Sequence, residues 1–244
     1  MSEARDNAGS PTVVLVHGAF ADASSWNGVI KRLQAKGIEV TAPANPLRGI
    51  EIDSAYTAEV LEEIPGPVLL VGHSYGGAVI SNAATDAKNV VGLVYVAAFA
   101  PDEGEALGEV TPTSKDSVLN SALVPHHFPS NGGESVEFAI DPAKVREAFA
   151  SDLPDEQVAL IGATQRPIAE AAFSEKTGPP AWKNLPTWAV VATGDKAAGA
   201  DLVRSMAQRA GANITEVEGS HVIMISQPEA VTDVILEAID AVAS

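Results

Sequence analysis

The sequence predicts an α/β fold in which a mainly parallel six-stranded sheet is flanked by helices, and three observations support this prediction. Short apolar runs alternate along the chain with segments of helical periodicity. Most of these runs are continuously apolar, as expected of strands covered on both faces of a parallel sheet. The chain has 244 residues, of which 46% are hydrophobic, and this is enough for one sizeable core.

Six segments are predicted strands because they are short, rich in apolar or β-branched residues and bounded by turn-forming residues. The first, TVVLVH, follows Pro11 and ends before Gly18, and the fifth, TWAVVAT, lies between Pro186 and Gly194. The predicted strands cover residues 12–17, 38–42, 67–73, 90–98, 187–193 and 213–218.

Helical patterns fill most of the connections. In the first of them the side chains of Trp26, Val29 and Leu33 fall on one stripe, and the pattern closes at a glycine. Asp53 is the expected N-cap of the second helix, and Pro228 suits the first turn of the last one. The predicted helices cover residues 24–37, 53–64, 75–87, 201–211 and 227–243.

Residues 101–186 break this alternation. They begin with a polar, turn-rich stretch, PDEGEALGEVTPTSKDSVLNS. Short helical patterns follow near residues 142–150, 154–164 and 167–174. We therefore expect a single domain over residues 1–244. Its core comprises about 11–100 and 187–244, and a helical cap insert at about 101–186 covers the edge of the sheet.

Charge and composition exclude several classes of function. The formal net charge is −17, with 15 Lys and Arg against 32 Asp and Glu, which argues against nucleic acids and anionic membranes as partners. The absence of cysteine excludes disulfides, thiolate catalysis and cysteine-based metal centres. The start of the chain lacks a signal-peptide core, and the apolar stretch 90–100 is too short to span a bilayer, so we expect a soluble, cytoplasmic protein.

Residues 72–76, GHSYG, match the pattern Gly-x-Ser-x-Gly. Small flanking residues let the chain turn sharply from strand to helix, so that the hydroxyl of Ser74 projects from the turn. A serine in a glycine-rich turn is often only a turn former. Here an apolar strand precedes it and an apolar-periodic helix follows it, which favours Ser74 as a nucleophile.

A serine hydroxyl needs a base to take its proton. His221 lies between the last predicted strand and the last helix, where this architecture places such a base; the alternative is an ordinary loop histidine. His73 precedes the serine and should point elsewhere, and His17 more simply shapes the loop after the first strand. The pair at 126–127 lies in the insert. Adjacent residues rarely point at one ion and no carboxylate cluster lies close in sequence, so we predict no metal site and interpret the pair as cap residues.

The base in turn needs an acid that orients it. Asp195 follows the fifth predicted strand in VVATGDK and is our candidate, although an aspartate at a strand end is also a common turn or capping residue. The competing acids are Asp201, a helix-cap candidate by position, and Asp102, at the end of the fourth strand. For the oxyanion of a tetrahedral intermediate, the backbone N–H groups of Ala19 and Tyr75 are the expected donors.

The segments HGAF, GHSYGG, TGD and GSH, in this order, resemble the α/β-hydrolase superfamily, which has the chain order Ser, Asp, His. The short front end and HGAFADASSW are similar to the compact branch of plant methylesterases, hydroxynitrile lyases and small bacterial esterases. The resemblance implies Ser74 as nucleophile, His221 as base, Asp195 as orienting acid and Ala19 and Tyr75 as oxyanion donors. It also implies a helical cap and no cofactor. The chain departs from many relatives after Asp195, where KAAGADL replaces a proline-containing turn.

The expected function is cofactor-independent hydrolysis of a small, largely apolar carboxylic ester through an acyl-enzyme. The alternatives on the same site are hydroxynitrile lyase, lactonase, carbon–carbon hydrolase or perhydrolase chemistry, or a small-molecule receptor with slow turnover. The related lyases typically carry a threonine at the position of Gly18 and a lysine near the pocket, for which Lys196 is the candidate. The candidate apolar wall residues are Phe20, Phe128, Phe149, Phe173 and Trp182.

Overall fold

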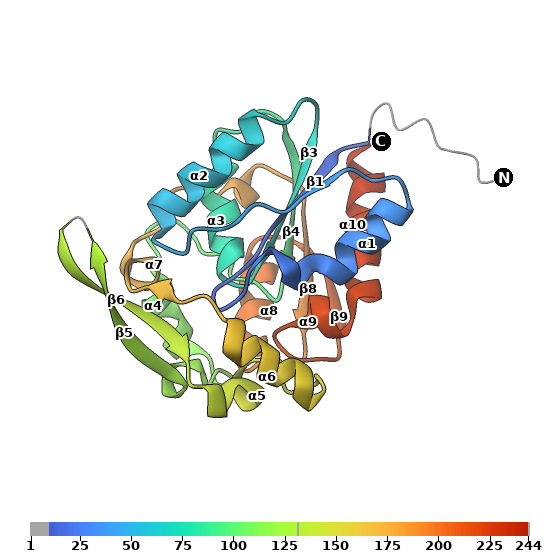
Figure 1. The fold of residues 1–244 in the computed structure, drawn as a ribbon. Coiled ribbons are helices and arrows are strands. Elements are labelled where there is room, and N and C mark those ends of the chain that lie inside the picture. Colours follow the sequence, from blue (N-terminus) through green and yellow to red (C-terminus); the bar gives the residue numbers. More distant parts are fainter. Residues whose placement is uncertain (1–9, 131, 244) are drawn as a thin grey trace.

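The computed structural model describes residues 10–130 and 132–243. Its centre is a six-stranded sheet in the order β2-β1-β3-β4-β8-β9, and all five neighbouring pairs are parallel (Figure 1). The strands are β1 (Thr12–Val16), β2 (Val40–Thr41), β3 (Val68–His73), β4 (Val90–Val96), β8 (Thr187–Ala192) and β9 (Asn213–Val217). The predicted six-stranded α/β fold is confirmed.

Helices cover both faces of the sheet, which is why its central strands are continuously apolar. In β3 and β8 every residue is buried. Figure 1 shows α1 and α10 on one face and α2 and α3 on the other, in agreement with the contacts between these pairs. The helices of the core are η1 (Ala23–Trp26), α1 (Asn27–Ala35), α2 (Ile50–Glu62), α3 (Tyr75–Ala83), α8 (Ala200–Arg209), α9 (Ile223–Ser226) and α10 (Pro228–Val242).

The start of α2 differs from the prediction. The helix begins at Ile50, so Asp53 lies inside it rather than at its N-cap. Its buried carboxylate nevertheless reaches back and accepts the backbone N–H of Arg48, at 3.1 Å from each oxygen. The sequence therefore indicated an aspartate that serves the start of this helix, but placed the boundary three residues too late.

The insert between β4 and β8 differs from the expected helical cap. It contains an antiparallel sheet in the order β5-β6-β7 as well as short helices. Strand β5 carries two prolines and is largely exposed, and an edge position tolerates both features. The elements of the insert are α4 (Leu107–Val110), η2 (Thr111–Thr113), η3 (Leu119–Ser121), β5 (Leu123–Ser130), β6 (Gly133–Ile140), η4 (Pro142–Lys144), α5 (Val145–Ala148), α6 (Asp155–Thr164), β7 (Ile168–Ala169), α7 (Ala171–Ser174) and η5 (Ala181–Lys183).

The insert lies across the carboxyl ends of the parallel strands, where ligand sites of open α/β sheets are found (Figure 1). It is tied to the core by an ion pair between Arg48 and Glu137, 2.7 Å, and by the backbone hydrogen bond from Ala169 N–H to Leu47 O, 2.9 Å. The loops that follow the strands are therefore enclosed between the sheet and the insert.

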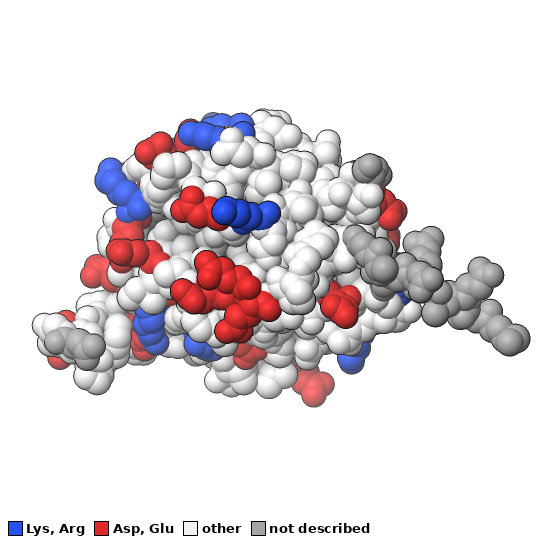
Figure 2. Space-filling model, turned by 90° about the horizontal axis from the view of Figure 1, so that it is seen from above, with Lys and Arg blue, Asp and Glu red and all other residues white. Residues whose placement is uncertain are grey.

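Acidic side chains gather on the face of the molecule seen from above in Figure 2, with a few basic ones among them. This distribution agrees with the net charge of −17. Across residues 10–130 and 132–243, the helices are all too short or too polar to cross a membrane.

Candidate active site

Ser74 occupies the tight turn between β3 and α3. Its backbone has φ 53° and ψ −123°, a combination that non-glycine residues rarely adopt and that stores strain. The neighbouring glycines make this turn possible. A Cβ on Gly72 would lie 2.6 Å from the carbonyl oxygen of Gly76, and a Cβ on Gly76 would lie 2.5 Å from that of Val16. The Gly-x-Ser-x-Gly pattern is therefore a steric requirement of the turn.

We expect Gly72→Ala to destabilise the protein by about 3 kcal/mol or more, because the added methyl group would clash with backbone atoms, which cannot rotate away as a side chain can. The measurement is the free energy of unfolding in urea. Gly132→Ala is the control, since nothing lies within 4 Å of a Cβ built there. Equal unfolding midpoints for the two variants would contradict this account of the turn.

The structure brings Ser74, His221 and Asp195 together in one hydrogen-bonded chain. His221 Nε2 lies 2.8 Å from Ser74 Oγ, and His221 Nδ1 lies 2.8 Å from Asp195 Oδ2. The imidazole and the carboxylate are both 1% exposed, so water does not compete with their hydrogen bond. The three residues come from the loops after β3, β8 and β9, which meet at one edge of the sheet.

Asp195 is held by the segment KAAGADL that follows it. Its Oδ1 accepts the backbone N–H groups of Ala197 at 2.9 Å and Ala198 at 3.1 Å, which leaves Oδ2 for His221. The two competing acids lie elsewhere. Asp201 accepts the backbone N–H of Lys115, and Asp102 pairs with Lys183 at 2.5 Å.

His73 contacts the backbone and the ring of His221 and makes no hydrogen bond to Ser74. Its Nε2 lies 2.9 Å from the backbone carbonyl oxygen of His221, and the two ring centroids are 4.7 Å apart. Complete burial lowers the pKa of His73 well below its usual value, so the ring is neutral and donates to this carbonyl. This hydrogen bond helps to fix the position of the loop that carries His221.

His17 shapes the loop after β1, as expected. Its Nδ1–H donates to Gly18 O at 2.9 Å, and its Nε2 accepts the backbone N–H of Asn45 at 3.0 Å. Burial lowers the pKa of His17, which is consistent with this neutral tautomer. The loop passes very close to the serine, because a Cβ on Gly18 would lie 2.7 Å from Ser74 Cβ.

Tyr75 and Ala19, whose backbone N–H groups are the expected oxyanion donors, belong to the serine turn and to the loop that approaches it. Tyr75 is the first residue of α3, where a backbone N–H has no partner within the helix, and Ala19 follows the glycine that touches Ser74. Both residues are buried. The N-terminus of α3 also contributes a favourable dipole to negative charge at this point.

The side chain of Tyr75 anchors this turn to α2. Its hydroxyl donates to Asp53 Oδ2 at 2.7 Å, and both residues are buried. Burial raises the pKa of the Tyr75 hydroxyl well above its usual value and also raises the pKa of Asp53. Sequence analysis missed this role of Asp53, since the only local signal was a capping aspartate.

We expect Tyr75→Phe to destabilise the protein by about 1–3 kcal/mol, because a buried carboxylate oxygen then loses a donor. The backbone N–H is unchanged, so the variant separates anchoring of the turn from donation to an oxyanion. Urea unfolding measures the first effect. Tyr56→Phe, at a 43% exposed tyrosine of the neighbouring helix, is the control. Identical stability of both variants and the parent would contradict an anchoring role.

The insert contributes to the surroundings of His221. The backbone N–H of Ser220 donates to Asp152 Oδ2 at 2.9 Å, and its hydroxyl donates to Asp152 Oδ1 at 2.5 Å. The ring centroid of Phe149 lies 5.2 Å from that of His221. No local sequence signal pointed to Asp152, because its partner is 68 residues away along the chain.

Of the five candidate wall residues, Phe20 and Phe149 lie beside the site and pack edge to face, with ring centroids 6.0 Å apart. The other three lie elsewhere. Phe128 stacks beneath the guanidinium of Arg48, and Phe173 packs on another phenylalanine of the insert. Trp182 is buried and donates from its indole to a backbone carbonyl.

The two adjacent histidines of the insert lie on exposed strand β5. His127 pairs with Glu134 across the hairpin at 2.8 Å. Throughout the described chain, no group of three or more His, Asp or Glu side chains is placed to hold a metal ion.

Comparison with known proteins agrees with the fold. The profile of the "Alpha/beta hydrolase family" matches residues 13–234. Methylesterase 8 of Arabidopsis thaliana is 27% identical, over 93% of this chain and 89% of that protein. Alpha-hydroxynitrile lyase of the same plant is 26% identical, over 90% of this chain and 93% of that protein.

A solved structure extends this likeness to three dimensions. The crystal structure of polyneuridine aldehyde esterase superimposes with a TM-score of 0.80 and 21% sequence identity. The match covers 94% of this chain and 99% of that chain, and at this identity it concerns the fold alone. Since the family profile spans most of the sequence and the sheet has the matching architecture, this chain belongs to the α/β-hydrolase family.

Proposed function

We propose that the protein is a cofactor-independent serine hydrolase that cleaves a small, largely apolar carboxylic ester. The observation that carries this proposal is the buried hydrogen-bonded chain from Ser74 through His221 to Asp195. The strained backbone of Ser74 and the two backbone donors beside it support the same chemistry. Several similar proteins, such as Methylesterase 8, bear the names of esterases.

The first half of the reaction forms an acyl-enzyme. His221 Nε2 takes the proton of Ser74 as the hydroxyl oxygen attacks the ester carbonyl carbon. The backbone N–H groups of Ala19 and Tyr75 receive the negative charge that develops on the carbonyl oxygen. As the tetrahedral intermediate collapses, the imidazolium gives its proton to the leaving alcohol.

The second half releases the acid. His221 takes a proton from a water molecule, which attacks the acyl carbon, and then returns the proton to Ser74 Oγ. Throughout the cycle Asp195 accepts the Nδ1–H of His221. It thereby fixes the tautomer in which Nε2 can act as a base, and it stabilises the imidazolium that forms.

The geometry disfavours the lyase alternative. A threonine at position 18 does not fit this loop, because its Cβ would lie 2.7 Å from Ser74 Cβ and 2.8 Å from His73 O. Lys196 is exposed, so its ammonium group is not enclosed with the site. We therefore assign ester hydrolysis rather than cyanohydrin cleavage.

The test is mass spectrometry of the native protein after treatment with a fluorophosphonate, together with hydrolysis of p-nitrophenyl acetate and octanoate. We expect a single adduct on Ser74, its loss in His221→Ala, and release of p-nitrophenolate. A folded protein that takes up no adduct and hydrolyses neither ester would refute the proposal. Cleavage of mandelonitrile with no ester hydrolysis would instead identify a lyase.

A further inference from the structure

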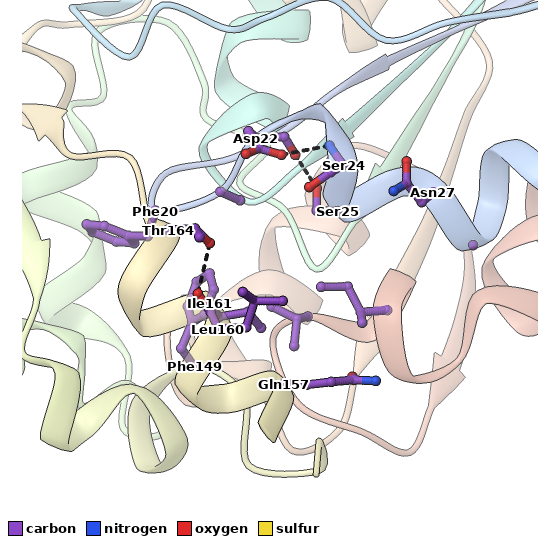
Figure 3. Close-up of a pocket in the computed structure, with 14 residues that line it drawn as sticks. Phe20, Asp22, Ser24, Ser25, Asn27, Phe149, Gln157, Leu160, Ile161 and Thr164 are labelled. Atoms are coloured by element: carbon purple, nitrogen blue, oxygen red, sulfur yellow. Dashed lines mark hydrogen bonds between the residues drawn. The ribbon is translucent and has the colours of Figure 1, made fainter. Parts of the chain in front are cut away.

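A cavity of about 350 Å³ lies beside the candidate active site, between insert helix α6 and the segment that carries η1 and the start of α1 (Figure 3). Three of its wall residues are immediate neighbours of the site. Phe20 follows Ala19, Val222 follows His221, and Phe149 packs against the His221 ring. The cavity therefore shares walls with the site, although neither Ser74 nor His221 is among the described residues that line it.

The position of the cavity selects one arm of an ester. In the proposed reaction His221 gives a proton to the leaving alcohol, so the alcohol oxygen must lie on the side of this imidazole. Phe149 packs against this imidazole, Val222 is the next residue along the chain, and both line the cavity. A group attached to the alcohol oxygen therefore starts on the side of the imidazole where these two residues border the cavity.

The lining of the cavity selects the chemistry of that group. Helix α6 contributes Leu160 and Ile161 together with the polar Gln157 and Thr164, and the opposite side carries Asp22 and Ser24 (Figure 3). A hydrogen bond from Ser24 lowers the pKa of Asp22, and Lys, Arg and His are absent from the described lining residues. A carboxylate ligand would meet this charge with no cation in the lining itself, since Arg166, whose charge also lowers the pKa of Asp22, lies outside it. A neutral group with apolar surface gains by burial.

We propose that this cavity binds the alcohol arm of the substrate, and that this arm is a neutral group of aromatic or branched aliphatic type. The inference rests on the proposed ester hydrolysis and adds the part of the ester that is recognised and the residues that select it. A volume of about 350 Å³ is within the usual size of small-molecule sites, on the order of 300–1,000 Å³.

The test compares ethyl acetate with 2-phenylethyl acetate, which enlarges the alcohol arm, and with ethyl 3-phenylpropanoate, which enlarges the acyl arm. Ile161→Trp fills the cavity and should lower kcat/KM for 2-phenylethyl acetate relative to ethyl acetate at least about tenfold. The ratio for the acyl-arm pair should change less than about twofold. Ala159→Trp is the matched control, because this exposed residue lies on another side of the same helix and lines a different hollow.

A second variant covers the case in which the tryptophan prevents folding. Ile161→Ala widens the cavity and should raise kcat/KM for 2-(1-naphthyl)ethyl acetate relative to that for ethyl acetate. The assignment is overturned if Ile161→Trp and Ala159→Trp alter the alcohol-arm ratio equally, or if the acyl-arm ratio is the one that responds. The assignment is also overturned if Ile161→Ala leaves kcat/KM for the naphthyl ester, relative to ethyl acetate, unchanged.

Binding of 2-phenylethanol, measured by calorimetry, separates this inference from the proposed function. If no ester is hydrolysed, the proposed function fails. The cavity is then judged by the alcohol alone, which should bind to the parent protein and to Ala159→Trp, and at least tenfold more weakly to Ile161→Trp. Equal binding to all three proteins, or tighter binding of 3-phenylpropanoate than of the neutral alcohol, would overturn the assignment.

Discussion

Ser74→Ala is expected to abolish ester hydrolysis, with a fall in kcat on the order of 10⁶-fold, the loss found when a serine protease is deprived of its nucleophile. In this chain Ser74 Oγ is the atom that His221 Nε2 contacts at 2.8 Å, and alanine offers no atom for that contact or for the acyl group. The measurements are kcat with p-nitrophenyl acetate and the mass of the protein after treatment with fluorophosphonate.

The stability of this variant gives a second readout. The backbone at Ser74 has φ 53°, which strains alanine as it strains serine. Ser74 as a whole is 6% exposed, so the removed hydroxyl belongs to a buried residue. We expect a folded protein whose unfolding free energy falls by about 1–3 kcal/mol, because the buried His221 Nε2 loses its hydrogen-bond partner. Ser205→Ala, on the exposed face of α8, is the control and should keep full activity. Normal hydrolysis by Ser74→Ala would refute the proposed mechanism.

The core of the fold was predictable because its signals are local. Each parallel strand buried on both faces requires an unbroken apolar run, and TVVLVH and TWAVVAT show this without ambiguity. The end of a run was less well defined. Strand β2 pairs at only two positions, although residues 38–42 carry a strand pattern, because it forms the edge of the sheet.

The insert was less predictable because its strands lack that signal. Strand β5 reads LVPHHFPS, in which two prolines and exposed polar residues conceal the pairing with β6. Its partner, GESVEFAI, is only half-buried. A hairpin at the rim is stabilised by cross-strand pairing rather than by a buried face, so neither strand needs a continuous apolar run.

The same distinction applies to the site. Ser74 and His221 could be proposed from the sequence because each stands in a short segment whose position in the fold is indicated by the strand before it. The groups that support them act over long separations: Asp53 reaches Tyr75 across 22 residues, and Asp152 reaches Ser220 across 68. Such partners depend on how the insert and α2 pack, and one sequence carries no pattern for that.

Asp195→Asn is expected to lower kcat by about 10⁴-fold, the effect of the same change in a serine protease, while the fold persists. The reason lies in the hydrogen bonds of this side chain. Oδ1 is held by the N–H groups of Ala197 and Ala198, so the asparagine keeps its oxygen there and turns its NH₂ group toward His221 Nδ1. Nδ1 must then accept, the ring proton moves to Nε2, and Nε2 can no longer take the proton of Ser74.

Asp102→Asn is the matched control, since it removes the competing acid at the end of β4 and breaks only a partly exposed pair with Lys183. Its kcat with p-nitrophenyl acetate should stay within about twofold of the parent, because such pairs contribute little. The rate of fluorophosphonate labelling at Ser74 should fall in parallel with kcat in Asp195→Asn, because both need a basic Nε2. A loss of activity in Asp102→Asn with full activity in Asp195→Asn would show that Asp102, and not Asp195, orients His221. Comparable activity in both variants would mean that His221 is oriented chiefly by its backbone contact with His73 and by the insert.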